Sequence, residues 1–224
     1  MSQEGEDRSV LPFLLPQSAI LCGSTQCGKT TYLRKLLLDS SYMFQPKPEK
    51  VVYCYAAWQS SYQELEEHWG DNIEFRTSVP SREELLEISQ NFQHVILVLD
   101  DLMHQLCNDD IVSAICFMCS HRNLSTFLLI QNFYYESKHL RTISLNVQSI
   151  LLFRNYRSVR QVKTLASQMC PGNTEYFMSA YEKATSKPYS CLIIDINPRS
   201  DRKFHLRSGV LRDELPIVYL PIKK

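Results

Sequence analysis

One segment constrains the fold of this chain more than any other, the run Gly-Ser-Thr-Gln-Cys-Gly-Lys-Thr at residues 23–30. An apolar stretch, 18–22, precedes it and is typical of a buried strand, and a segment expected to be helical, 29–39, follows it. The pattern G-x-x-x-x-G-K-[ST] between a strand and a helix is that of a loop that binds phosphate groups. Its glycines let backbone amides curl around the phosphates, and the start of the helix adds partial positive charge. The sequence therefore predicts a nucleotide-phosphate site.

Two side chains of this loop have expected roles toward a bound nucleotide. Lys29 is expected to reach the β- and γ-phosphates, and the hydroxyl of Thr30 to ligate Mg²⁺. ATP and Mg²⁺ are the predicted cofactors; the alternative is a glycine turn that binds nothing. The predicted nucleotide-binding residues are Gly23, Ser24, Thr25, Gln26, Cys27, Gly28, Lys29, Thr30 and Thr31.

A pair of carboxylates, Asp100 and Asp101, follows a second apolar strand, 95–99. In nucleotide hydrolases the carboxylate at such a strand end holds Mg²⁺, and the next one polarises the attacking water. We therefore assign Asp100 to the metal and Asp101 to the water. Many ATPases have glutamate, and not aspartate, at the second position. The alternative interpretation is that the pair caps the helix that follows it.

The distance between the two motifs, about seventy residues, indicates the type of hydrolase. A strand at 51–55 lies between them, and an extra strand between the motif strands is typical of motor-type ATPases. In these a polar residue at the end of a neighbouring strand senses the γ-phosphate or its water. Gln131 ends the next strand, 126–130, and is predicted to have this role, although an ordinary strand-end residue is the alternative.

The rest of the chain continues the alternation of strands and helices, which predicts an α/β fold with a mostly parallel sheet and helices on both faces. We expect a flexible N-terminus, 1–12, and a single domain, 13–224, in which 155–224 is a basic C-terminal elaboration. The other expected strands lie at 51–55, 73–75, 149–153, 189–194, 203–206 and 217–219. The other expected helices lie at 62–69, 81–90, 108–120, 159–169 and 174–184.

Composition excludes two classes of protein. The chain is 44% hydrophobic and 21% charged, which is typical of a globular protein and not of a disordered one. No apolar run approaches the ~18 residues of a membrane span, and the polar, acidic start differs from a signal peptide. These features predict a soluble, intracellular protein.

Charge is distributed unevenly along the chain. Residues 1–110 contain 8 Lys+Arg and 17 Asp+Glu, and residues 111–224 contain 16 and 7. Such asymmetry indicates a surface that faces a polyanion, complementary faces in an oligomer, or scattered solvated charge. One basic group, for which DNA phosphate contact and a solvated helix face are both open, comprises Arg154, Arg157, Arg160 and Lys163.

The eight cysteines show no compact paired framework and are expected to be thiols in a reducing compartment. Four residues, His104, Cys107, Cys116 and Cys119, have spacings that could hold zinc. Apolar residues in the same segment repeat at helical spacing, so packing of these side chains in a core is the favoured interpretation.

A resemblance to a known family rests on three segments. These are the motif at 23–30, Leu-Asp-Asp-Leu at 99–102, and His-Arg-Asn-Leu-Ser-Thr-Phe-Leu-Leu-Ile-Gln-Asn at 121–132. Together they resemble the DNA-packaging ATPases of the FtsK–HerA superfamily, in particular the poxvirus-type branch of large DNA viruses, virophages and Polinton or adintovirus-like elements. The resemblance extends over about 14–160, and the segments 187–189 and 192–195 are consistent with it.

The resemblance implies a homo-oligomeric ring that drives double-stranded DNA into a preformed capsid. It thus implies DNA and a capsid or portal component as partners, and the site of virion assembly as the location. No second domain of the nuclease kind found in large terminases is visible. Ring motors complete each site with an arginine from the neighbouring subunit. Arg122 is the favoured candidate and Arg141 the alternative.

Two rival functions remain at this stage. A nucleoside or nucleotide kinase shares the first motif, but the long spacing, the two aspartates and the terminal Gln131 disfavour it. A non-motor protein that binds nucleotide and works by assembly is disfavoured by the intact Lys29, Thr30 and Asp100. The leading hypothesis is an ATP-hydrolysing DNA translocase. The most informative test is to measure ATP hydrolysis with and without long duplex DNA.

Overall fold

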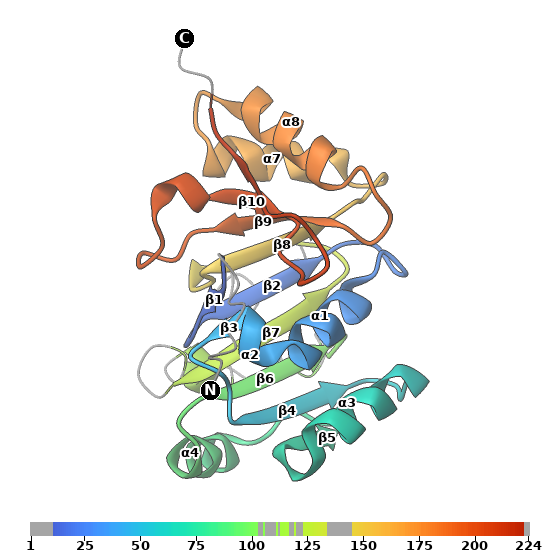
Figure 1. Ribbon diagram of the computed structural model, residues 1–224, viewed down its shortest axis with the longest axis vertical. Coiled ribbons are helices and arrows are strands. Elements are labelled where there is room, and N and C mark those ends of the chain that lie inside the picture. The colour runs from blue at the N-terminus through green and yellow to red at the C-terminus, as the bar shows by residue number, and fades with distance from the viewer. Residues whose placement is uncertain are drawn as a thin grey trace, which may run out of the picture.

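A computed structural model of the chain describes residues 11–102, 105, 111, 113–116, 119, 123–133 and 145–221. Its centre is a nine-stranded sheet with the order β11-β10-β9-β8-β2-β7-β6-β4-β5, and β1 and β3 form a separate small sheet (Figure 1). The strands are β1 (Phe13–Leu14), β2 (Ser18–Cys22), β3 (Phe44–Gln45), β4 (Lys50–Tyr55), β5 (Ile73–Arg76), β6 (Val95–Asp100), β7 (Leu124–Ile130), β8 (Ser149–Phe153), β9 (Cys191–Asp195), β10 (Leu206–Ser208) and β11 (Ile217–Tyr219).

Helices cover both faces of this sheet. They are α1 (Lys29–Leu38), α2 (Ser40–Met43), α3 (Gln63–Trp69), α4 (Arg82–Asn91), α7 (Val159–Met169) and α8 (Thr174–Ala184), with short 3-10 turns at Ser60–Tyr62, Gly70–Asn72 and Arg202–Phe204. Helix α4 begins with a capping box, in which the Ser81 hydroxyl accepts from the Glu84 amide while the Glu84 carboxylate accepts from the Ser81 amide.

Successive side chains of the central strands point to opposite faces of the sheet and pack in two separate cores. In β2, Ile20 packs in a core with residues of α4, α7 and α8, whereas Leu21 packs in the opposite core with residues of α1 and α3. Every residue of β2, β6, β7 and β8 is buried, as expected for parallel strands with helices on both faces. The predicted α/β class is confirmed. None of the helices in the described segments is both long and apolar enough to cross a membrane.

The order of the central strands places β7 between β2, which leads into the phosphate loop, and β6, which ends in Asp100. All pairs from β8 through β5 are parallel, so their carboxyl ends meet at one edge of the sheet. The extra strand expected between the two motif strands is therefore present. It is β7, which follows both motifs in the sequence. The strand that the spacing pointed to, 51–55, was the wrong candidate, because β4 pairs with β6 on the side away from β7.

The C-terminal strands extend the sheet in antiparallel fashion, and here the expected boundaries were wrong. The strand expected at 189–194 begins only at Cys191, because Tyr189 adopts a positive φ of 63° that ends extended pairing. The strand expected at 203–206 is a 3-10 turn followed by β10, because the Asp201 side chain accepts a hydrogen bond from the Lys203 amide and tightens the chain.

Residues before β2 are held by the C-terminal part of the chain. The Arg199 guanidinium donates to the carbonyls of Leu14, Leu15 and Pro16 at 2.8–3.2 Å. Leu11 is buried, and its carbonyl accepts from Arg207, so the packed chain includes one residue expected in the flexible start. The remainder of that start, 1–10, lies outside the described residues.

Candidate nucleotide-binding site

A cavity of about 360 Å³ opens at the carboxyl edge of the sheet, where β2, β6 and β7 end. This is the edge at which open α/β sheets place their ligands. The cavity is lined by Thr25, Gln26, Gly28, Lys29, Thr30, Thr31, Gln59, Asp100, Asp101, Leu129, Gln131 and Tyr189. Residues of both sequence motifs and the predicted sensor thus share one cavity.

The phosphate loop has the backbone conformation that the glycine pattern predicts. Gln26 and Gly28 have positive φ values of 63° and 99°, which turn successive backbone groups to one side of the loop. Gly23 cannot carry a side chain, because a Cβ there would lie 2.7 Å from Cβ of Phe153. The loop ends at Lys29, the first residue of α1, whose N-terminus faces the cavity. Backbone amides turned to one side and the start of a helix are together suited to bind an anion.

The Lys29 ammonium lies across the loop. Its Nζ donates to the carbonyls of Gly23 at 2.7 Å and Ser24 at 3.0 Å. Both acceptors are neutral, so the positive charge has no carboxylate partner among the residues that the structure describes. A polyphosphate in the loop would supply the missing negative charge, which fits the predicted role of Lys29.

Asp100 is buried beside α1 and accepts three hydrogen bonds at one oxygen. The hydroxyls of Thr30, Tyr53 and Tyr62 lie 3.1, 3.0 and 3.1 Å from its Oδ2. Burial raises the pKa of this carboxyl above its ordinary value, and the three hydroxyl donors oppose that rise. No salt bridge within the described segments includes Asp100.

The residues at this point fit a magnesium ion. Asp100 is a buried carboxylate without a cation partner in the part of the chain that the structure describes, and it lies against the hydroxyl of Thr30 at the start of α1. Hard oxygen ligands of this kind, completed by water and phosphate oxygens, are those that Mg²⁺ prefers. Thr30 and Asp100 would hold the ion, which would neutralise charge between phosphate oxygens when bound.

Asp101 and Gln131 face each other across the ends of β6 and β7. The Gln131 Nε2 lies 3.3 and 3.4 Å from the two carboxylate oxygens of Asp101. Both residues are exposed to the cavity, and Asp101 has a φ of 58°, a left-handed conformation uncommon for a residue other than glycine. That turn directs Asp101 away from the buried strand. A hydrated carboxylate held by an amide is suited to orient a water molecule.

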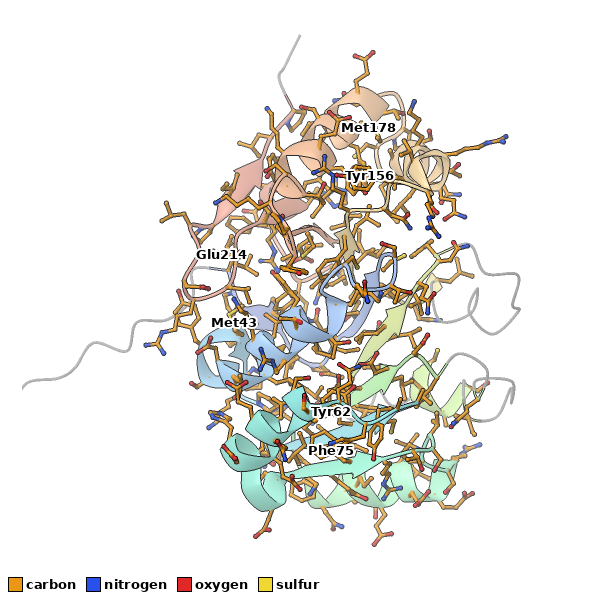
Figure 2. All side chains as sticks on the ribbon, turned by 90° about the vertical axis from the view of Figure 1, so that its right-hand side faces the viewer. Met43, Tyr62, Phe75, Tyr156, Met178 and Glu214 are labelled. Carbon is orange, nitrogen blue, oxygen red and sulfur yellow. The ribbon has the colours of Figure 1, made fainter. Side chains whose placement is uncertain are left out.

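Sequence reasoning missed the two tyrosines that bind Asp100. Tyr53 lies in β4, and Tyr62 ends the 3-10 turn before α3. The two tyrosine rings pack on each other and on the ring of Phe75. The Tyr62 and Phe75 rings are stacked, with their centroids 5.6 Å apart, and both residues are labelled in Figure 2. Two tyrosines within apolar strand-like and helix-like segments have no local signal for this role. The pairing of β4 with β6 brings the Tyr53 hydroxyl to Asp100, and Tyr62 reaches the same carboxylate from the turn before α3, where its ring packs on that of Tyr53.

The predicted DNA-contacting group is exposed and begins at the same edge of the sheet. Arg154 follows β8, and its guanidinium lies 4.8 Å above the ring of Tyr156, a side chain that is 77% exposed (Figure 2). Arg157, Arg160 and Lys163 continue onto α7, each exposed to solvent. The structure thus gathers this group outside the nucleotide cavity, whose lining it does not join.

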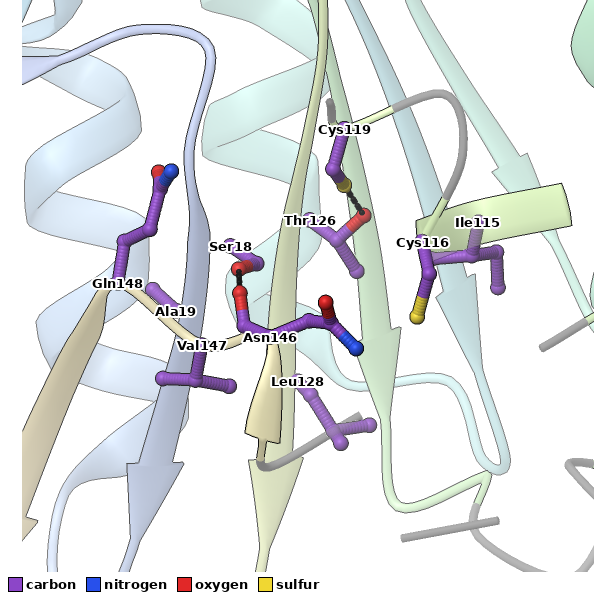
Figure 3. A pocket seen from close by; sticks show the side chains of 10 residues that line it. All are labelled: Ser18, Ala19, Ile115, Cys116, Cys119, Thr126, Leu128, Asn146, Val147 and Gln148. Carbon is purple, nitrogen blue, oxygen red and sulfur yellow. Dashed lines mark hydrogen bonds between the residues drawn. The ribbon is translucent and has the colours of Figure 1, made fainter. Parts of the chain in front are cut away.

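Several predicted residues lie outside the described residues, namely Arg122, Arg141, His104 and Cys107. The roles proposed for the two arginines therefore stay predictions. Cys116 and Cys119 line a small cavity of about 30 Å³ at the opposite edge of the sheet (Figure 3). The Cys119 Sγ lies 3.1 Å from the Thr126 hydroxyl, and burial raises the pKa of this thiol to about 12. The zinc alternative stays untested, since two of its four ligands are not described.

Comparisons with known proteins identify the fold. Neither a protein-family model nor a curated protein sequence matches this chain. Among solved structures, the genome packaging NTPase B204 from Sulfolobus turreted icosahedral virus 2, in complex with ATP-gammaS, is similar with a TM-score of 0.55 and 12% identity. The likeness covers 92% of this chain and 98% of that one. The cytoplasmic domain of the Type VII secretion ATPase EccC from Thermomonospora curvata is similar with a TM-score of 0.50 and 12% identity, over 93% of this chain and 26% of that one.

These similarities agree with the resemblance drawn from the sequence. The chain has the α/β fold of P-loop NTPases, a viral genome packaging NTPase among them. The particular branch named from the sequence stays a prediction.

Proposed function

We propose that this protein is a Mg²⁺-dependent, ATP-hydrolysing DNA translocase, which works as a viral or virus-derived genome-packaging motor. The observation that carries the proposal is the convergence of Lys29, Thr30, Asp100, Asp101 and Gln131 on one cavity, with β7 inserted between the two motif strands. The likeness to a packaging NTPase over nearly the whole length of both chains supports the motor function over a phosphotransferase.

The described residues divide the hydrolytic work among them. Lys29 and the amides of the loop bind the phosphates and stabilise charge that develops on the γ-phosphoryl oxygens. Asp101, oriented by Gln131 at 3.3–3.4 Å, positions the attacking water and takes up its proton. Asp100 and Thr30 would hold Mg²⁺, which would supply positive charge to the phosphates when bound. Loss of Asp100 would therefore affect binding of the metal, whereas loss of Asp101 would affect activation of the water.

The proposed motor acts as a homo-oligomeric ring around double-stranded DNA, with a capsid or portal component as a further partner. A neighbouring subunit would supply a transition-state arginine, and Arg122 is the favoured residue with Arg141 as the alternative. The basic group of Arg154, Arg157, Arg160 and Lys163 supplies exposed positive charge for duplex phosphates. The proposed place of action is the site of virion assembly inside an infected cell.

Steady-state ATP hydrolysis with and without long duplex DNA tests the proposal, on protein whose assembly is measured in parallel. Turnover should rise with duplex DNA of any sequence. Affinity for DNA should fall with salt by about 0.9 in log K per log salt for each phosphate contacted. If assembled rings hydrolyse ATP at the same rate with and without DNA, the protein is not a translocase. Phosphate transfer to a nucleoside or nucleotide would indicate a kinase.

A pair of double variants locates the DNA contact. Arg157→Ala with Arg160→Ala should lower the magnitude of the salt slope by about 1.8 if both side chains contact phosphates. The matched control, Arg202→Ala with Lys203→Ala, removes the same charge at the opposite edge of the sheet, where β9 ends. Equal changes of slope in both double variants would show that only net charge matters and would remove α7 from the proposed DNA path.

A further inference from the structure

Tyr189 occupies an unusual position for an aromatic residue. Its φ is 63°, a left-handed conformation that is strained for a bulky side chain, and the side chain is 63% exposed. Pro188 precedes it, and the loop is closed by hydrogen bonds from the amide and hydroxyl of Ser190 to the Lys187 carbonyl. Strain of this kind persists where the surroundings impose it, and it often marks functional positions. Burial in a core does not account for the conformation.

The ring of Tyr189 lies directly on the phosphate loop. A Cβ built on Gly28 would meet its Cδ1 at 2.7 Å, its Cβ at 2.9 Å and its Cγ at 3.1 Å. Gly28 is therefore needed both for its φ of 99° and for the space that the ring fills. Tyr189 also lines the nucleotide cavity, and it is the one aromatic side chain among the described residues that do so.

The order of the strands indicates which end of a bound nucleotide would lie near this ring. Asp100, Asp101 and Gln131, which act on the γ-phosphate end, lie on the β6 and β7 side of the loop. Tyr189 lies two residues before β9, whose first residue pairs with the carboxyl end of β8 on the other side of β2. A phosphate chain that runs through the loop with its γ end toward Asp101 therefore places its nucleoside end toward Tyr189.

We propose that Tyr189 is the nucleoside-binding residue of this site and that its ring stacks on the base or ribose of a bound purine nucleotide. The inference rests on the proposed nucleotide binding and adds the part of the ligand that neither sequence motif recognises. Stacking on an aromatic face tolerates different bases, because every base has a π face, and larger rings gain more contact. The site should therefore accept ATP and GTP and bind pyrimidine nucleotides more weakly.

Calorimetric titration with Mg²⁺-ADP and with Mg²⁺-pyrophosphate separates the nucleoside contact from the phosphate contact, because neither ligand carries a hydrolysable γ-phosphate. Tyr189→Ala should weaken ADP binding by about tenfold, or about 1.4 kcal/mol, and leave pyrophosphate binding within about twofold. Tyr189→Phe should retain ADP affinity, since the stacking face remains. CDP should bind the parent protein more weakly than ADP and GDP, and Tyr189→Ala should reduce that difference.

Tyr156→Ala is the matched control, because it removes an exposed tyrosine at the same edge that does not line the cavity. It should leave the affinities for ADP and pyrophosphate unchanged. Equal losses for ADP and pyrophosphate in Tyr189→Ala would show that the ring only supports the loop, and a gain would show that it covers the site. Either result, or no change, overturns the inference. If the parent protein binds pyrophosphate but Tyr189→Ala does not weaken ADP binding, the inference about Tyr189 is wrong and the proposed phosphate site stands. If the parent protein binds neither ligand, the proposed function is wrong as well.

Discussion

Replacing Tyr62 by phenylalanine removes one of the three hydroxyl groups that donate to Asp100 and leaves the ring in place. The hydroxyl lies 3.1 Å from Oδ2, and the side chain is only 1% exposed, so water cannot easily replace the lost donor. A hydrogen bond to a charged group contributes about 1.5–3 kcal/mol, against about 0.5–1.5 kcal/mol for a neutral acceptor. We expect Tyr62→Phe to lower the free energy of unfolding by the larger amount where Asp100 is ionised.

The pH dependence follows from the position of Asp100. Its folded-state pKa is raised above 3.8 by burial, so ionisation destabilises the native state and stability falls as pH rises through the folded pKa. The Tyr62 hydroxyl opposes this rise, and its removal moves the pKa of Asp100 further upward. The loss of stability in Tyr62→Phe should therefore be greater at a pH above the folded-state pKa of Asp100 than at a pH below it.

A double-mutant cycle in urea, followed by circular dichroism, isolates the pair. In an Asp100→Asn background the acceptor is neutral, and Tyr62→Phe should cost about 1–1.5 kcal/mol less than in the parent. Tyr181→Phe is the matched control, since this buried hydroxyl forms its hydrogen bonds with the backbone of Phe153 and Asn155 and not with a carboxylate of the described residues. An equal cost of Tyr62→Phe in both backgrounds, or a cost independent of pH, would refute the charged hydrogen bond.

Three further predictions concern the phosphate loop, the water and the core. Lys29→Ala should abolish hydrolysis and weaken ATP binding, because the phosphates lose their cation; turnover above a tenth of the parental rate, about 1.4 kcal/mol of barrier, would contradict its role. Asp101→Asn should bind Mg²⁺-ATP with parental affinity in a filter-binding assay but hydrolyse it poorly, and parental turnover would transfer the role of base to another group. Arg207→Ala should lower the free energy of unfolding in urea by about 3 kcal/mol. Arg207 is buried 3.1 Å from Asp195, and its loss leaves a buried carboxylate without its cation. A loss below about 1 kcal/mol would show that the Ser200 hydroxyl and the Asn197 amide are sufficient hydrogen-bond donors for that carboxylate.

Local patterns in the sequence were sufficient for most of the regular elements and for the ends of the two motif strands. β2, β8, α7, α8 and β11 have the bounds expected from their apolar patterns, and the capping box at Ser81 forms as its spacing indicates. The phosphate loop is equally local, since its glycines, its lysine and the start of α1 are contiguous. Such features follow from interactions between residues close in the chain, which the sequence displays directly.

Contacts between distant segments were decided by the tertiary structure alone. Periodicity shows which face of a strand is apolar, but not which strand lies beside it. Motif spacing therefore predicted an extra strand between β2 and β6 and pointed to 51–55, whereas the strand at that place is β7. The Tyr53 hydroxyl reaches Asp100 because β4 pairs with β6, and the Tyr62 hydroxyl reaches it because the turn before α3 packs on Tyr53. Tyr189 reaches Gly28 only because β9 turns back antiparallel to β8 at the edge where the phosphate loop begins. A nucleotide site of this kind has its phosphate-binding part written locally in the sequence, while the groups that tune its metal ligand and meet its nucleoside end are brought there by strand order.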